Sequence, residues 1–430
     1  MFKLYRQLTI CLFLLLAASG TALAESLLIS PHVYHHELSP YLEYLEDTEG
    51  QLEIEDILLD HKSSKNWTKN TKQVPNMGMT NSVFWFRLTI SNPTEYSIVR
   101  LLELSYPLLN SVSLYQFEGG QLIANYIAGH SISFHARPIE HRHLVFPLEL
   151  TAKTESQVYL RVESKNGIQM PLDLWEERVF WSQDQARLSW QFLYYGLMIV
   201  MIGYNLFLAT VMRDKIYLYY VFTMTFICGF QAILHGAAYQ FLWPGLPEWN
   251  ALSMAVITPL SNAFSCLFSM QMLRTQTGIG YVHTVLRGCT AVSLTLALLA
   301  IFLPYRVVIV VSAAAVVMSA IVVCIACFKT WASNKNDARI FTAAWFIFVV
   351  GCMVMFLNKF SLLPYTWFTE NLLQITSGIS TILLSLALAE RINRLRDTEL
   401  ILKKHQLDTR EREIMYETEL LEASRGQIRK

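Results

Sequence analysis

The middle of this 430-residue chain has very little charge. Asp, Glu, Lys and Arg make up 16% of all residues, against about 25% in an ordinary soluble domain, and most of them lie in residues 25–187 and 391–430. The net charge is zero, so no excess of basic residues points to nucleic acid as a partner. The charge-poor stretch is expected to lie in a membrane.

Cysteine is absent from residues 25–187, so this segment is expected to fold by core burial without disulfides. The seven cysteines of the chain are Cys11, Cys228, Cys266, Cys289, Cys324, Cys327 and Cys352. Cys324 and Cys327 have the spacing of redox and zinc motifs. They lie in an apolar segment without a second ligand pair, so we interpret them as packing residues.

Motifs for catalysis are missing as well. The sequence contains no phosphate-binding glycine loop, no GGDEF-like loop and no G-x-S-x-G. His405 lacks the sequence context of a kinase phosphoacceptor, and no ATP-binding region follows it. We therefore expect no enzymatic activity, no resident cofactor and no metal site.

The first 24 residues predict a secretory signal peptide. Lys3 and Arg6 form a basic start, residues 8–18 an apolar core, and residues 22–24 (ALA) a cleavage site before Glu25. The apolar core is too short for a stable span, although an uncleaved anchor is the alternative. Residues 25–185 are thus expected to form an exported domain.

Residues 186–390 predict seven transmembrane helices, each close to the roughly 20 apolar residues that cross about 30 Å of hydrocarbon. The predicted spans are 189–211, 216–236, 250–272, 286–304, 306–328, 339–358 and 371–390. The fourth and fifth are expected to meet in a very tight hairpin at Pro304. A six-span arrangement is the alternative.

Lys and Arg in the loops predict the orientation. With the N-terminal domain outside, the inside loops carry Arg213, Lys215, Arg274, Arg287, Lys329, Lys335 and Arg339. The outside loops carry only Arg306 and Lys359. This bias predicts an outside N-terminal domain and an inside C-terminus.

Polar residues within the spans are few. Asn205, Asn262 and Asn358 are interpreted as partners in hydrogen bonds between helices. No span holds the row of ionisable residues that a proton-coupled transporter needs, which counts against a transporter or permease accessory subunit as the alternative function.

The exported domain alternates apolar and polar residues with a period of two, so we expect short strands. The clearest lie at 84–90, 112–117, 121–126, 142–150 and 158–162, with a hairpin at Glu118-Gly119-Gly120. The predicted fold is an all-β sandwich of jelly-roll type.

Four side chains of this domain are candidate ligand-binding residues. Trp85 and Arg87 share a strand face and could stack on a sugar. His141 and His143 share one face of a predicted strand, near His130 and His135, which would suit a pH sensor or metal site. Packing, or a role in the framework of the domain, is the alternative for all four.

Several motifs resemble the bacterial 7TMR-DISM family, the seven-transmembrane receptors with diverse intracellular signalling modules. In the exported domain they are FWFRL at 84–88 with Asn-Pro at 92–93, and FHARP at 134–138, which contains Arg137. In the membrane part they are GYNLF at 203–207, YLYY at 217–220, YQFLWP at 239–244 and SLALAERI at 385–392.

The resemblance implies a type-2 extracellular sensor domain, similar to carbohydrate-binding modules, and adds Arg137 to the candidate ligand-binding residues. It implies a receptor of the bacterial inner membrane with a periplasmic sensor. The expected partners are a periplasmic carbohydrate or other small molecule, membrane lipid, and a kinase or cyclase acting in trans.

Residues 391–430 predict a cytoplasmic signalling helix without an output domain. Leu400, Leu407, Ile414 and Leu421 recur every seven residues, as in a weak coiled coil or homodimer. A receptor fragment that has lost its kinase or cyclase, and a solvated helix, are the alternatives.

Overall fold

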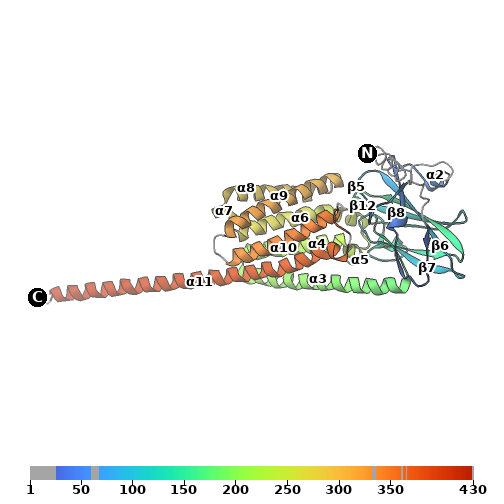
Figure 1. Cartoon of the computed structure of the whole chain (residues 1–430). Helices are drawn as coiled ribbons and strands as arrows, with labels where there is room; N and C mark the ends of the chain where they lie inside the picture. Colours follow the sequence, from blue (N-terminus) through green and yellow to red (C-terminus); the bar gives the residue numbers. More distant parts are fainter. Residues whose placement is uncertain (1–25, 60–66, 332–335, 360–361, 365, 429–430) are drawn as a thin grey trace, which may run out of the picture.

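A computed structural model of the chain describes residues 26–59, 67–331, 336–359, 362–364 and 366–428. A β-rich domain lies at one end of a bundle of long helices, and one helix projects from the opposite end (Figure 1). The predicted signal peptide, residues 1–24, lies outside the described residues.

The larger sheet of the β-rich domain has seven strands in the order β4-β3-β6-β11-β8-β9, with β1 parallel to β6. Its strands are β1 (Leu27–Leu28), β3 (Glu43–Asp47), β4 (Thr68–Lys69), β6 (Val83–Asn92), β8 (Ser111–Glu118), β9 (Gln121–Ala128) and β11 (Thr154–Glu163). A short helix, α2 (Ile54–Leu59), lies between β3 and β4 in the chain.

The second sheet has four antiparallel strands in the order β10-β7-β13-β2. They are β2 (His35–Glu37), β7 (Ile98–Leu104), β10 (Leu144–Leu150) and β13 (Leu172–Trp175). A two-stranded ribbon pairs β5 (Asn76–Met79) with β12 (Gly167–Gln169).

The two larger sheets enclose one hydrophobic core. Phe84, Phe86 and Leu88 of β6 face Leu102 of β7 and Phe146 of β10, all nearly inaccessible to water. The alternation along β6 sends every second side chain into this core, as the period of two predicts. The predicted all-β sandwich is confirmed.

The predicted hairpin at residues 118–120 is confirmed, but the predicted strand 142–150 is too long. Gly119 and Gly120 adopt left-handed φ values of 58° and 83°, which glycine tolerates, and join β8 to β9. Strand β10 begins only at Leu144. His141 and His143 therefore lie in the segment before the strand rather than on its face.

Seven helices are long and apolar enough to span a membrane within the described residues, as predicted. They are α3 (Glu177–Met212), α4 (Lys215–Leu234), α6 (Pro247–Met272), α8 (Gly280–Leu299), α9 (Tyr305–Trp331), α10 (Asn336–Lys359) and α11 (Trp367–Ile428). Short helices α5 (Ala237–Phe241) and α7 (Thr275–Gly278) lie in two connections.

The helix ends differ from the predicted spans in two places. Helix α8 ends at Leu299, so residues 300–304 form a looser connection to α9 than the predicted hairpin at Pro304. Helix α3 begins at Glu177, about 12 residues before the predicted span. Its 36 residues measure about 54 Å at 1.5 Å per residue, more than the roughly 30 Å of hydrocarbon.

The loop contacts agree with the predicted orientation. Arg306, at the start of α9, donates to Asn81 Oδ1 and the Met79 carbonyl, both at 3.3 Å. The carbonyl of Lys359, at the end of α10, accepts from Asn76 Nδ2 at 2.7 Å. The predicted outside loops thus lie against the sandwich, and α11 projects on the other side (Figure 1).

Candidate functional site

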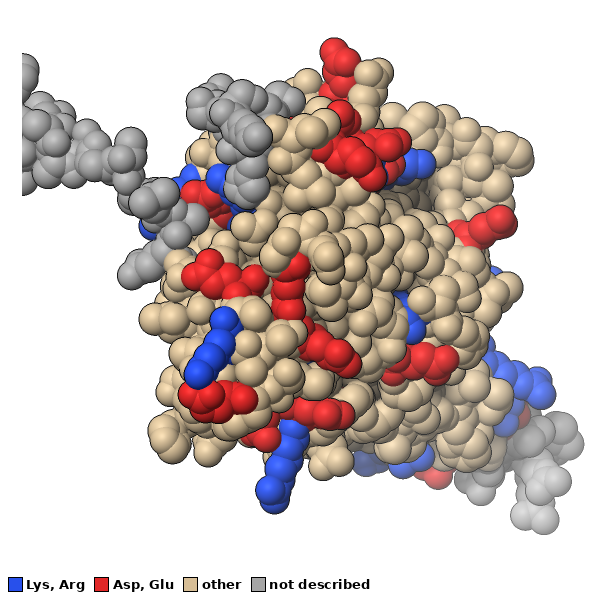
Figure 2. Space-filling view, turned by 90° about the vertical axis from the view of Figure 1, so that its right-hand side faces the viewer, with Lys and Arg blue, Asp and Glu red and all other residues tan. Residues whose placement is uncertain are grey.

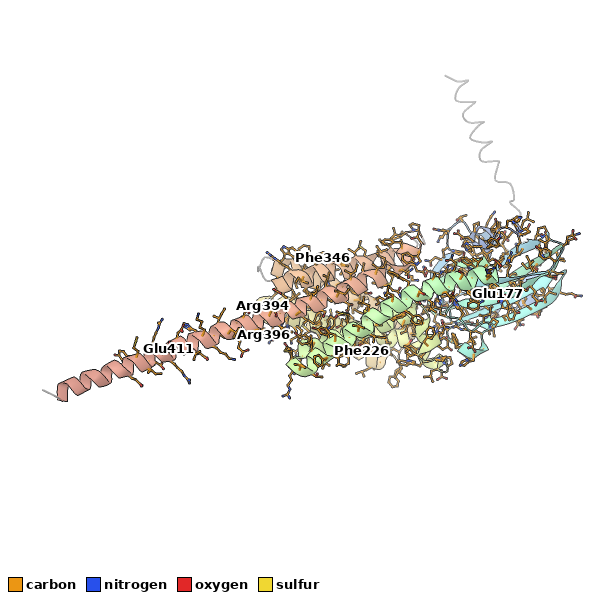
Figure 3. All side chains as sticks on the ribbon, turned by 90° about the horizontal axis from the view of Figure 1, so that it is seen from below. Glu177, Phe226, Phe346, Arg394, Arg396 and Glu411 are labelled. Carbon is orange, nitrogen blue, oxygen red and sulfur yellow. The ribbon has the colours of Figure 1, made fainter. Side chains whose placement is uncertain are left out.

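The first membrane helix begins on the sandwich itself. Only Glu176 separates the end of β13 from the start of α3. Phe180 of α3 is buried against Leu101, Val145 and Trp175 on the outer face of the four-stranded sheet. Figure 3 shows Glu177 at the level of the strands, with α3 running from there into the bundle. The four-stranded sheet and the first membrane helix are thus packed together.

A buried ion pair joins α3 to the segment before β10. Asp184 Oδ2 lies 3.2 Å from the Nη1 atom of Arg142, and Asp184 Oδ1 lies 3.0 Å from His141 Nε2. The side chains of Arg142 and Asp184 are 1% and 8% exposed. A charge buried this deeply needs its partner, because leaving it alone in a low dielectric is costly.

A second charged cluster lies one turn further along α3. Arg187 donates to both oxygens of Glu103 on β7, at 3.1 and 3.2 Å. His143 Nδ1 lies 2.6 Å from Glu103 Oε1. Together with the pair at Asp184, these contacts form what we call the ionic junction: Glu103, His141, Arg142, His143, Asp184 and Arg187.

Burial and the contacts within the ionic junction shift the pKa values of Glu103 and His143. Burial alone would raise the pKa of Glu103, but the hydrogen bond from His143 and the charge of Arg187 bring it down to about 2. Burial lowers the pKa of His143 to about 4. At neutral pH Glu103 is therefore ionised, and a neutral His143 donates its Nδ1–H to it.

Helix α5 and the first turn of α6 make a second set of contacts with the sandwich. Tyr239 of α5 donates to the Ile132 carbonyl at 2.6 Å, and Asn250 of α6 donates to the His130 carbonyl at 2.9 Å. The guanidinium of Arg137 lies 5.3 Å from the Tyr239 ring centroid and donates to the His141 carbonyl at 2.6 Å. Arg137 therefore links this contact to the ionic junction.

At Gly236 the backbone of the α4–α5 turn comes close to the backbone of the sandwich. This residue has φ +74°, and a Cβ placed on it would lie 2.6 Å from the Arg142 carbonyl oxygen. A small cavity lies beside this contact and is lined by groups of both domains, among them His130, Arg137 and Tyr305. Within the described segments, no group of three His, Cys, Asp or Glu side chains is placed to hold a metal ion.

Trp85 and Arg87 lie elsewhere, on the face of the seven-stranded sheet away from the main core. Trp85 is fully buried in a second cluster with Ile57 of α2 and with Phe117 and Tyr159. Arg87 is partly exposed; its guanidinium lies 4.2 Å from the Trp67 ring centroid and its Nε donates to Glu43 Oε2 at 2.7 Å.

The five residues predicted from the sequence thus fall into two groups. Arg137, His141 and His143 meet at the junction with the helices, whereas Trp85 and Arg87 lie on the other sheet. Sequence reasoning missed the partners of the first group: Glu103, Asp184 and Arg187. The spacing of Asp184 and Arg187 was a usable signal, because residues three apart share a helix face.

Inside the bundle, the first span is bonded to the last. Tyr194 of α3 shares a 3.1 Å hydrogen bond with Ser377 of α11, and Asn205 Nδ2 donates to Ser385 Oγ at 3.1 Å. Both asparagine and serine are buried. These bonds connect the helix that starts on the sandwich to the helix that leaves the membrane.

This architecture defines a multi-pass membrane protein with an extracellular N-terminal domain coupled directly to its transmembrane bundle. The family model described as 7TM diverse intracellular signalling matches residues 187–391, and the model described as 7TMR-DISM extracellular 2 matches residues 39–176. The chain belongs to the 7TMR-DISM family, a family of receptor-type membrane proteins rather than enzymes. No curated protein matches the chain.

Proposed function

We propose that this chain is a receptor of a bacterial inner membrane that binds a carbohydrate or other small molecule in the periplasm. The seven spans relay this binding to a separate cytoplasmic output protein of the kinase or cyclase type. The observation that carries the proposal is the ionic junction, which couples the sensor sheet to α3 through two buried carboxylates, Glu103 and Asp184.

The proposed ligand face is the outer side of the seven-stranded sheet around Arg87. Trp67 and Arg87 form a stacked aromatic and cationic pair there, and such planar groups suit the faces and hydroxyl groups of a sugar. Figure 2 shows that acidic side chains are more widespread than basic ones on the end of the sandwich that points away from the bundle. This charge favours a neutral or cationic ligand over an anion.

We assign Arg137, His141 and His143 to transmission. His141 contacts Asp184 of α3, and the guanidinium of Arg137 contacts the Tyr239 ring of α5. His143 bonds to Glu103, the same carboxylate that Arg187 of α3 binds. Movement of the sandwich would therefore displace α3, and the bonds from α3 to α11 would carry the displacement to the cytoplasmic side.

The test uses full-length protein in lipid nanodiscs with a spin label at Glu411→Cys on the exposed part of α11. A panel of neutral mono- and disaccharides is screened by thermal shift, and the label is then followed as the active sugar is added. Arg87→Lys should weaken binding at least fivefold. Asp184→Asn should leave binding intact while abolishing the label response. If the label moves equally in Asp184→Asn, the relay through the ionic junction is wrong.

A further inference from the structure

Helix α11 continues far beyond the bundle (Figure 1). All side chains from Asp397 to Glu417 are exposed. Among them Leu400, Leu407 and Ile414 are 58%, 61% and 64% exposed, although they recur every seven residues on one side of the helix. Figure 3 shows this part of the helix projecting alone, with Glu411 about midway along it. An apolar stripe of this kind is a surface for pairing with another helix.

Charged residues occupy the other core position of each heptad, which we call the companion position. Asp397, Lys404 and Glu411 lie three residues before or four residues after the apolar ones, where a coiled coil places the second residue of each core layer. Their charges alternate: negative, positive, negative. We call these six residues the signalling seam: Asp397, Leu400, Lys404, Leu407, Glu411 and Ile414.

Two copies of this chain would pair poorly through the signalling seam. Both copies are held in the same bilayer by seven spans, so their helices leave the membrane at the same depth. A parallel pair is then in register, and each residue faces its own copy. Asp397, Lys404 and Glu411 would each meet a like charge in three successive core layers, which is unfavourable.

A shift of one heptad would remove this repulsion but is blocked by the membrane. It would bring Asp397 opposite Lys404 and Lys404 opposite Glu411. It would also move one copy along the helix axis by about 10 Å, seven residues at 1.5 Å each, relative to the same bilayer. A helix of another protein, free to choose its register, has no such constraint.

We propose that the signalling seam binds a helix of a different protein rather than a second copy of this chain. This inference rests on the proposed relay to a separate output protein and names the contact that it uses. The partner helix carries apolar residues against Leu400, Leu407 and Ile414. It carries basic, acidic and basic residues against Asp397, Lys404 and Glu411. This order reads the same in both directions, so it fits a parallel or an antiparallel helix.

The first test measures binding of two synthetic helical peptides to the full-length chain in nanodiscs by fluorescence anisotropy. Both have leucine at the positions that face Leu400, Leu407 and Ile414. They differ only at the positions that face Asp397, Lys404 and Glu411, with Lys-Glu-Lys in one and Glu-Lys-Glu in the other. Each exposed charge pair changes affinity modestly, and three together amount to at least tenfold in favour of Lys-Glu-Lys. The triple variant D397K/K404E/E411K should reverse the preference, whereas Glu413→Lys, one residue off the seam, should preserve it.

The second test uses the chain as its own partner. Wild-type and D397K/K404E/E411K chains, each with Leu407→Cys, are reconstituted together, so that in-register pairs of unlike chains have complementary charges. Disulfides between unlike chains should form at least ten times faster than those between two wild-type chains. Equal rates, equal binding of the two peptides, binding of neither, or an unreversed preference would each overturn the proposal. Neither test uses a periplasmic ligand. A negative result in these tests would therefore overturn the proposed helix contact without deciding whether the chain binds a periplasmic ligand.

Discussion

Arg142 of the sandwich and Asp184 of the first membrane helix face each other across the domain boundary, with Nη1 and Oδ2 at 3.2 Å and almost no contact with solvent. The two residues are 42 positions apart in the chain. Breaking such a pair leaves a full charge in a low dielectric, so the sandwich and α3 are expected to move as one body.

Asp184→Asn should therefore destabilise the whole protein. Loss of the carboxylate leaves Arg142 buried without its counter-charge, which costs about 3–5 kcal/mol of unfolding free energy. Thermal unfolding of the detergent-solubilised protein measures this loss. Glu177→Gln, which removes an exposed acid from the same helix, is the control and should change stability by less than about 0.5 kcal/mol. Similar losses in both variants would contradict a special role for the pair.

Acidification should destabilise the sandwich, beginning below pH 6.5. Burial lowers the pKa of His130 to about 4, so between about pH 6.5 and 4 the unfolded chain binds a proton that the folded chain excludes. Stability then falls as the pH falls, by at most about 1.4 kcal/mol per pH unit for this group. His143 acts in the same direction, since burial also lowers its pKa to about 4. The lowered pKa of Glu103 adds a loss only as the pH falls from about 4.5 toward about 2.

The variant His130→Asn tests the assignment of this pH dependence. It removes the titrating group, so the slope of unfolding free energy between pH 6.5 and 4 should become shallower by up to about 1.4 kcal/mol per pH unit. Urea unfolding at several pH values gives the slope. An unchanged slope would show that His130 already binds its proton in the folded state.

Gly236→Ala should weaken the contact between the α4–α5 turn and the sandwich. The new Cβ would lie 2.6 Å from the Arg142 carbonyl oxygen at a left-handed φ of +74°, and the strain of that conformation alone costs about 1–2 kcal/mol. Gly196→Ala in α3 is the matched control, because a Cβ there meets nothing within 4 Å. That substitution should be neutral or slightly stabilising. Thermal unfolding compares the two, and equal midpoints would contradict a close approach at Gly236.

Substitution of Trp85 should reduce the folding free energy much more than substitution of Arg87. Trp85→Ala removes a fully buried aromatic and should cost about 3–5 kcal/mol of folding free energy. Arg87→Lys keeps a positive charge near Glu43 and should cost less than about 1 kcal/mol, while it removes the planar group that lies over Trp67. Chemical denaturation measures both, and a large loss in Arg87→Lys would make Arg87 a residue of the framework.

Asn205→Ala should weaken the link between the first and last spans. The variant removes the 3.1 Å bond to Ser385 Oγ, worth about 0.5–1.5 kcal/mol. The distribution of distances between a spin label on the outer end of α3 and a second label at Glu411→Cys should become broader. Thr210→Ala, which loses only a hydrogen bond to the Phe207 carbonyl within its own helix, should leave the distribution narrow. Matching distributions in the two variants would contradict the link.

The membrane helices could be predicted well because the signals for them lie within short stretches of sequence. A run of apolar residues must span hydrocarbon whatever surrounds it, and the positions of Arg213, Arg306 and Lys359 report orientation without knowledge of any contact. Alternation in residues 84–90 likewise reports a strand with one face in a core.

The spacing of Asp184 and Arg187 was a usable signal for a helix face, but the complete ionic junction could not be predicted because its members meet only after folding. Glu103, Arg142 and Asp184 lie on a strand, a loop and a helix, and no periodicity relates them. Strand β6 has buried side chains on both of its faces, but the sequence does not show what buries the second face. Trp85 is hidden by α2 and its neighbours, which a pattern of alternating residues does not reveal.

The hydrogen bond between Asn205 and Ser385 links the first membrane helix to the last. A coupling between the outside domain and the cytoplasmic part of α11 acts equally in both directions. If ligand binding on the sandwich changes the affinity of α11 for a cytoplasmic partner by some factor, that partner changes the affinity of the sandwich for its ligand by the same factor. A cell that makes more of the cytoplasmic partner would thereby alter the concentration at which the outside domain responds. The receptor's sensitivity would then be set partly from inside the cell.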